Sequence, residues 1–194
     1  REQRKLARHL QSPRYEAEIT ALAALFDPEN GLQHGPLAQE PALSVAQRLV
    51  RKHCKRCIRM ANAIDAQTLD EEVHELRLQC KKLRYLLDFF RPLFDPRDTK
   101  KLIKALKVLQ DNLGRFNDFS SQQISLQVFL DRQLMGKQPP SAQMVEAIGA
   151  LIVVKHQLQL TERARVMANC KAFAAPQTRR LVDQLTAGQQ QETR

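Results

Sequence analysis

The sequence contains no tryptophan and only two tyrosines among its 194 residues. Proteins that hold single-stranded nucleic acids usually stack successive bases on aromatic side chains. The shortage of these residues therefore argues against specific recognition of single strands. An uninterrupted apolar run of about 18 residues is also missing, so no segment is predicted to cross a membrane.

Glycine is scarce too, with six residues, and no long stretch shows the alternation of apolar and polar residues that is typical of a strand. Ala, Leu, Gln, Arg and Lys, which are good helix formers, dominate the sequence, and apolar residues recur at steps of three and four. The sequence therefore predicts an all-α protein, in which an N-terminal helical segment precedes an antiparallel four-helix bundle of long helices.

Clusters of Pro, Gly and Asp divide the predicted helices from one another. The helices are expected to cover about residues 1–26, 42–65, 69–91, 97–134, 141–174 and 177–187. Ser141 is expected to cap the helix that follows it, and either Asp70 or Thr68 is expected to cap the helix at 69–91. In terms of domains, the prediction has three parts: the tail of a first helical half at 1–35, a four-helix bundle at 36–188, and a frayed tail at 189–194.

The cysteines do not suggest a disulfide framework, because there are only four in a chain of this size. Cys54 and Cys57, with His53 and His74 nearby in sequence, offer possible zinc ligands, but no second Cys-x-x-Cys pair follows at zinc-finger spacing. A helical wheel places both thiols on the apolar side of their helix. They are predicted to be buried and inert, and neither a metal nor a cofactor is expected.

The N-terminal residues are highly charged, and this bears on localisation. Arg1-Glu2-Gln3-Arg4-Lys5 is too polar to lead into the apolar region of a signal peptide. A cytoplasmic location is therefore expected.

Positive charge is in clear excess. Lys and Arg number 31 against 21 Asp and Glu, which gives a formal net charge of +10 and a pI near 9.8. Such a balance predicts attraction to phosphate-rich partners or to anionic membranes. Residues 48–59 contain no acidic residue, although a helix face exposed to solvent would usually intersperse Glu, because like charges one turn apart repel each other.

Three of the predicted helices carry a basic stripe on the side opposite an apolar stripe. The predicted polyanion-binding residues are Arg48, Arg51, Lys52, Lys55 and Arg59 on the helix at 42–65, His74, Arg77, Lys81, Lys82 and Arg84 on the helix at 69–91, and Lys100, Lys104 and Lys107 on the helix at 97–134. If the apolar stripes meet in a core, adjacent basic stripes can merge into one positive groove. Arg binds phosphate as a bidentate fork and Lys as a mobile point charge.

The alternative is a solvated basic face without a ligand. Exposed basic residues elsewhere, such as Arg163, Arg179 and Arg180, are expected to matter little.

Catalytic motifs are not evident. His74-Glu75-Leu76-Arg77 resembles the phospho-acceptor box of sensor histidine kinases, but Leu78 and Gln79 replace the small polar residue and the Pro that usually follow. A kinase would also need an ATP-binding α/β domain, and the remaining sequence is predicted to be helical. No Gly-rich phosphate loop is present. An enzyme is therefore not expected.

Two motifs carry a resemblance to a known family. The segment from Val73 to Tyr85 resembles the signature H-x-x-R-h-x-x-[KR]-[KR]-h-R of the CHAD family, the α-helical domains with a conserved histidine, where h is apolar. The segment from Leu106 to Asp118 resembles the second family signature, L-K-x-L-Q-D-x-L-G-x-x-N-D. Ser12-Pro13-Arg14-Tyr15 also resembles a segment that closes the first half of such domains.

The resemblance implies two similar four-helix bundles around a basic channel that binds polyphosphate. Family members often lie in bacterial or archaeal cytoplasm on polyphosphate granules, and some are fused to a triphosphate-hydrolysing tunnel domain. The histidine motif occurs once here, whereas the family has one in each half, so residues from about 36 onward correspond to the second half.

The expected function is non-catalytic binding of inorganic polyphosphate. The alternatives are RNA binding by the same surface and an accessory role in a triphosphate or polyphosphate hydrolase. Other polyanions, a second copy of the chain or a separate first half are further expected partners.

Overall fold

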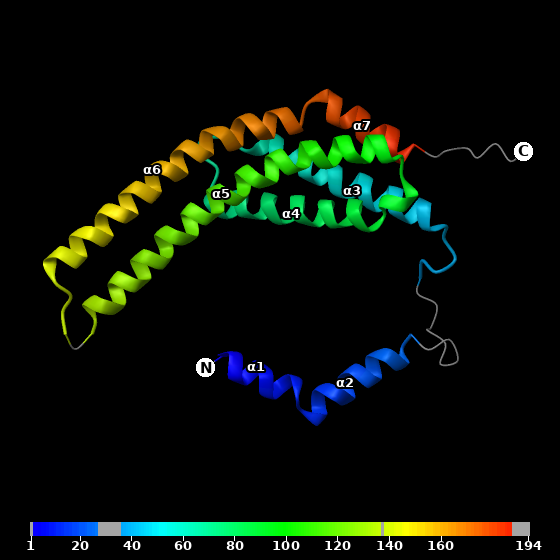
Figure 1. Ribbon diagram of the computed structural model, residues 1–194. Coiled ribbons are helices and arrows are strands. Elements are labelled where there is room, and N and C mark those ends of the chain that lie inside the picture. The colour runs from blue at the N-terminus through cyan, green and yellow to red at the C-terminus, as the bar shows by residue number, and fades with distance from the viewer. Residues whose placement is uncertain (1, 27–35, 137, 188–194) are drawn as a thin grey trace, which may run out of the picture. The chain divides into compact units, whose positions relative to one another are not determined.

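The computed structural model describes residues 2–26, 36–136 and 138–187. Every regular element within these ranges is a helix (Figure 1), which confirms the predicted all-α class. The chain divides into two compact units, Arg1–Glu40 and Pro41–Arg194. This division lies a few residues after the predicted boundary between 35 and 36, and the predicted frayed tail at 189–194 lies outside the described residues.

The first unit contains two short helices, α1 (Glu2–Leu10) and α2 (Pro13–Ala24). Ser12 caps α2 because its hydroxyl accepts a hydrogen bond from the Tyr15 amide at 3.2 Å. Neither helix has a buried residue. The two helices therefore form no core of their own.

The second unit contains the long helices. They are α3 (Ala42–Ala63), α4 (Asp70–Phe89), α5 (Pro96–Leu134), α6 (Ala142–Phe173) and α7 (Pro176–Thr186), with a short 3-10 turn, η2 (Arg91–Leu93), before α5. Ser141 caps α6 as predicted, since its hydroxyl accepts from the Met144 amide at 3.2 Å. The predicted cap of α4 is wrong. Leu69 occupies the cap position, and no side chain caps the helix. Asp70 does not act as the cap, because its carboxylate is engaged with residues of α5 and α6.

The core of the second unit lies where α3 and α5 each contact α4, α6 and α7. The predicted apolar stripes meet there, as expected. The fully buried members include Val50, Cys54, Leu76, Leu83, Leu87, Leu102, Leu106 and Leu113. Each buried Val or Leu stabilises the fold by about 1.5–3 kcal/mol relative to an exposed one. Ile64 and Phe90 are half-buried and pack against this core.

One side of this core is covered by two helices in succession, which were predicted at 141–174 and 177–187. The C-terminal part of α6 supplies Val166, Cys170 and Phe173, and α7 supplies Val182 and Leu185. The helix breaks between them because Pro176 cannot continue α6. As a result α7 lies against α3 and α5.

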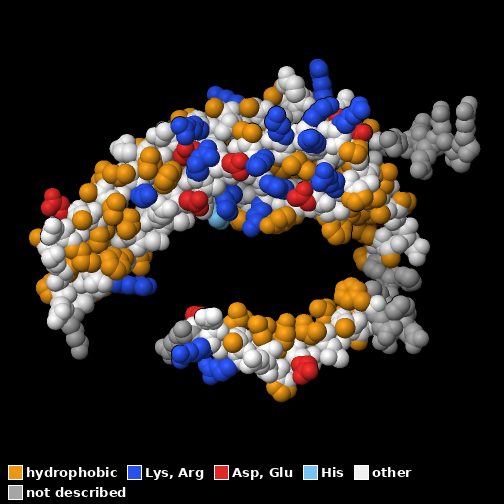
Figure 2. Space-filling view, viewed as in Figure 1, with side chains coloured by type: hydrophobic (Ala, Val, Ile, Leu, Met, Phe, Trp, Pro, Cys, Tyr) orange, Lys and Arg blue, Asp and Glu red, His pale blue; other side chains and the backbone are white. Residues whose placement is uncertain are grey.

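The paired ends of α5 and α6 extend past α3 and α4 (Figure 1). Hydrophobic side chains gather over this end, whereas Lys and Arg gather over the helices of the core (Figure 2). Ile124 and Val153, for example, are 63% and 60% exposed. No helix in the described part of the chain is long and apolar enough to cross a membrane.

Candidate polyanion-binding surface

The thirteen residues predicted to bind a polyanion all lie at the surface of the second unit. Arg51, Arg77 and Arg84 are half-buried, and the other ten are exposed. Each basic stripe lies opposite buried apolar residues of its own helix, so core packing orients the cations outward. Binding by these residues remains a prediction, but their exposure is the condition that it requires.

A hollow of about 360 Å³ lies between α4 and α5. Arg77, Lys81 and Arg84 line it from α4, and Gln110 lines it from α5. The Lys81 ammonium lies 5.7 Å from the centre of the Tyr85 ring, and Arg84 pairs with Asp88 at 3.5 Å. The hollow therefore combines several cations with one carboxylate, which favours an anionic ligand.

Two further hollows lie along α3, next to α7. One, of about 500 Å³, is lined by Gln47, Arg48, Arg51, Lys52, Lys55 and Thr186. The other, of about 390 Å³, is lined by Lys55, Ile58, Arg59, Asn62, Arg179, Val182 and Asp183. Lys55 lines both, so the two hollows adjoin each other. Arg51 is held in place because its Nε donates to the Thr186 hydroxyl at 2.9 Å and its Nη2 donates to the Thr186 carbonyl at 3.3 Å.

An ion pair links α3 to α4 at the surface. Arg56 on α3 pairs with Glu75 on α4 at 3.4 Å. Partial burial lowers the pKa of His53 below its usual value, and the charges of Lys52, Arg56 and Lys82 lower it further. Cations from both α3 and α4 therefore lie near His53. The two hollows along α3 draw their cations from α3 and α7, and the α4–α5 hollow draws its cations from α4. A single groove that merges the three basic stripes stays a prediction.

A hydrogen bond connects the two sequence motifs. His74 Nδ1 on α4 lies 2.5 Å from the Asn117 side-chain oxygen on α5. Because that oxygen accepts, Nδ1 carries the proton, and Nε2 donates to a phosphate only when the ring is charged. His74 therefore fixes α4 against α5 beside the α4–α5 hollow.

Comparison with known proteins agrees with these motifs. A family model described as the CHAD domain matches residues 1–127. The chain belongs to the CHAD family. The matched segment contains both signature motifs and the His74–Asn117 bond, and it ends within α5, so that α6 and α7 lie beyond it. No curated protein matches the chain.

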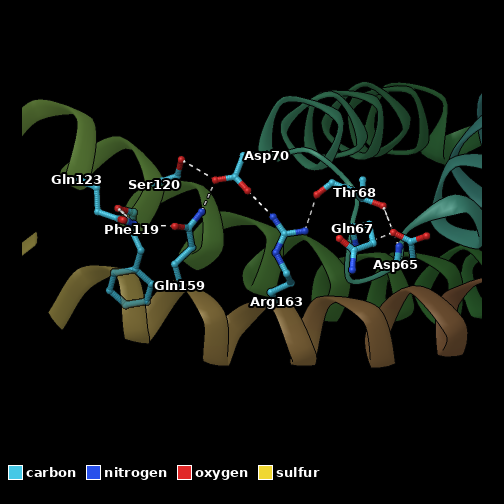
Figure 3. Close-up of polar contacts among 9 residues, drawn as sticks. All are labelled: Asp65, Gln67, Thr68, Asp70, Phe119, Ser120, Gln123, Gln159 and Arg163. Atoms are coloured by element: carbon cyan, nitrogen blue, oxygen red, sulfur yellow. Dashed lines mark hydrogen bonds and ion pairs between the residues drawn. The ribbon is translucent and has the colours of Figure 1, made fainter. Parts of the chain in front are cut away.

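Within this CHAD-family chain, a polar network joins the start of α4 to α5 and α6 (Figure 3). The Asp70 carboxylate accepts hydrogen bonds from Ser120 at 3.2 Å, from Gln159 and from Arg163. Arg163 also donates to the Thr68 carbonyl at 2.6 Å. The side chain of Arg163 is only 16% exposed, so its description as an exposed basic residue is wrong. Since its charge is paired, this Arg has a structural role.

The four cysteines of this CHAD-family chain are all buried, which confirms the prediction made for Cys54 and Cys57. Burial raises the pKa values of Cys54 and Cys170, the latter to about 12, and a hydrogen bond with Cys57 together with burial raises that of Cys80. Metals bind the thiolate form, which these sites disfavour. Among the described residues, no group of three or more His, Cys, Asp or Glu is placed to hold a metal ion.

This burial predicts slow thiol chemistry. In the native protein near pH 8, a thiol reagent such as Ellman's reagent is expected to label all four cysteines at least about tenfold more slowly than in urea, because the reactive thiolate is disfavoured and inaccessible. The absorbance of released thionitrobenzoate measures the rate. Rapid labelling of even one cysteine in the folded protein would contradict this expectation.

The sequence alone did not reveal the contribution of α7. Arg179 was expected to be remote from the candidate surface, but it lines a hollow with Lys55 and Arg59. Thr186, at the end of the same helix, holds Arg51. No local pattern marks these residues, because more than a hundred positions of sequence separate them from α3 and the fold alone brings them together.

Proposed function

We propose that this chain binds inorganic polyphosphate through the cations of α3, α4 and α5 and does not hydrolyse it. The observation that carries the proposal is the number of exposed or half-buried cations that form no ion pair among the described residues. Within the described residues, no ion pair involves the following members of the predicted set: Lys52, Lys55, Arg59, Arg77, Lys82, Lys100, Lys104 and Lys107. Charges left unneutralised within one protein surface favour an external anion.

Polyphosphate suits this arrangement because it is a flexible chain of linked anions. Cations one helical turn apart stand about 5–6 Å from each other, so each stripe offers a ladder that such a chain can follow. Arg forks and mobile Lys side chains both match phosphate oxygens. Membership of the CHAD family supports the same class of ligand.

RNA is the main competing ligand, because a basic surface attracts any phosphate chain. The hollows described above contain one aromatic residue, Tyr85, which offers little to stack on bases. Competition between long-chain polyphosphate and RNA of equal phosphate content, at matched salt, tests the choice. Preferential displacement of polyphosphate by RNA would contradict the proposal.

Hydrolysis is not proposed, because the hollows are poor in carboxylates. The α4–α5 hollow has Asp88, one α3–α7 hollow has Asp183, and the other has none. Phosphoanhydride hydrolases commonly position two metal ions with several carboxylates. Incubation with polyphosphate and Mg²⁺ or Mn²⁺ is expected to release no phosphate above the blank, whereas steady release would show that the chain itself is a hydrolase and would contradict the proposal.

The proposed setting is the cytoplasm, with the protein on polyphosphate granules. Self-association, or pairing with a separate first half, would bring further cations to the same ligand. The chain fused to a fluorescent protein is expected to lie on the granules when cells accumulate polyphosphate, and to spread evenly through the cell when they do not.

Salt dependence provides a quantitative prediction. By analogy with single-stranded nucleic acid, neutralising Z phosphates gives a slope near −0.7Z in a plot of log K against log salt. If about five cations engage, the slope is expected to lie near −3 to −4. Fluorescence anisotropy of labelled polyphosphate in a KCl series measures it. A slope close to zero would contradict binding of polyphosphate through the cations of this surface.

A further inference from the structure

Helix α7 brings an additional cation to α3. We propose that α3 and α7 together form a phosphate-binding track of their own, in which Arg179 acts with Lys55 and Arg59, separate from the hollow between α4 and α5. The ligand is a segment of a linear phosphate chain. This inference rests on the proposed polyphosphate binding and adds to it a second location and a residue that the family match does not reach.

The track is continuous along α3. The 500 Å³ hollow, which includes Gln47, and the 390 Å³ hollow, which includes Asn62, share Lys55. Residues 47–62 occupy roughly four turns of helix. A phosphate chain lying along them meets cations of α3 at every turn and Arg179 of α7 at one end.

The wall that α7 contributes is fixed before any ligand binds. Val182 and Leu185 are 4% and 6% exposed and pack in the core, and Thr186 holds Arg51 by two hydrogen bonds. Preorganisation of this kind reduces the entropy that is lost on binding. Arg179 therefore faces Lys55 and Arg59 without a rearrangement of the helix.

The cations in the 390 Å³ hollow are available for a ligand. Lys55, Arg59 and Arg179 form no ion pair within the described ranges. Asp183 is the single acid of the hollow, so the three cations exceed it in charge. This contrasts with Arg163, whose charge the Asp70 network neutralises.

Adjacent residues on α7 provide a matched experiment. Arg179 and Arg180 are both exposed, but Arg179 lines the hollow and Arg180 is not among its lining residues. R179E and R180E change the net charge equally at neighbouring positions, roughly 100° apart around the helix. R179E is expected to weaken binding of long-chain polyphosphate by about fivefold or more, and R180E by less than about twofold, because Arg180 does not line the hollow and makes no close charge-assisted contact with a ligand in it.

Double variants test whether the track is separate. For the double variant R179E/K55E, the fold loss of polyphosphate affinity is expected to be smaller than the product of the two single-variant losses, because both residues act on the same ligand segment. For the double variant R179E/K81E, the fold loss of affinity is expected to equal the product of the two single-variant losses, since Lys81 lines the α4–α5 hollow. Circular dichroism checks that every variant keeps the parent's helicity, and R179Q repeats the measurement without adding a negative charge.

The outcomes separate the two proposals. Equal losses for R179E and R180E, with a parent that binds polyphosphate, would overturn the α3–α7 track and leave the proposed function standing. Strong coupling between Arg179 and Lys81 would overturn the separation of the track from the α4–α5 hollow. A parent that does not bind polyphosphate at all would overturn both the proposed function and this inference.

Discussion

Replacing Lys81 and Lys82 with Glu is expected to weaken polyphosphate binding at least about tenfold, which corresponds to roughly 1.4 kcal/mol. Both side chains are exposed, Lys81 lines the α4–α5 hollow, and Lys82 lies close enough to His53 to affect its pKa. The variant thus removes cations on both sides of α4. Close charge-assisted contacts to phosphate are about twice as strong as neutral hydrogen bonds, so their loss exceeds that of distant charge.

The control for this variant must carry the same change of charge at a distance from the hollows. Arg179 does not serve, because it lines a hollow with Lys55 and Arg59. R132E/K171E is suitable, since Arg132 on α5 and Lys171 on α6 are exposed and line none of the three hollows. It is expected to bind within about twofold of the parent because of screening. If both double variants lose binding equally, attraction is diffuse and the assigned residues are wrong.

Replacing Arg163 with Ala is expected to destabilise the second unit by about 2–3 kcal/mol. The change removes the ion pair with Asp70, the hydrogen bond to the Thr68 carbonyl, and the contact with the Phe116 ring at 5.0 Å. The estimate lies below the full cost of breaking a buried pair because Asp70 is 36% exposed and keeps the hydrogen bonds from Ser120 and Gln159. Urea denaturation followed by circular dichroism measures the loss.

Arg165 provides the comparison on the same helix. Its side chain is 60% exposed, and it pairs with Glu162 at 2.6 Å. Arg165→Ala is expected to cost less than about 1 kcal/mol, because Arg165 is mostly exposed and the buried Glu162 carboxylate keeps its contacts with Asn112 and Arg115. If Arg163→Ala destabilises the protein no more than Arg165→Ala does, then the network around Asp70 does not hold α4, α5 and α6 together.

These two predictions separate two uses of positive charge in one basic chain. Arg163 is paired and mostly buried, so its removal is expected to affect stability. Lys81 and Lys82 are exposed, and neither forms an ion pair among the described residues, so their removal is expected to affect the ligand. Net charge alone does not distinguish the two classes, whereas burial and pairing do.

Sequence by itself determined the features that depend on neighbouring residues. The three- and four-residue spacing of apolar side chains predicted the helices and their apolar stripes, in which Val50, Leu76 and Leu106 are buried, because helical periodicity is local. It also predicted that Ser141 begins α6, since a cap bonds an amide three residues away. Burial of the cysteines followed from the same wheel, and the two motifs identified the CHAD family before the fold was known.

Tertiary structure decided what depends on residues far apart in the sequence. Asp70 resembles a helix cap in the sequence, but it binds Arg163 and Gln159 from α6. Arg179 resembles an exposed charge, but it joins Lys55 in a hollow because α7 packs against α3. Periodicity shows which face of a helix is polar, but it does not show which other helix that face meets. The orientation of neighbouring helices therefore decided which cations line a hollow together, and it follows from how the whole core packs.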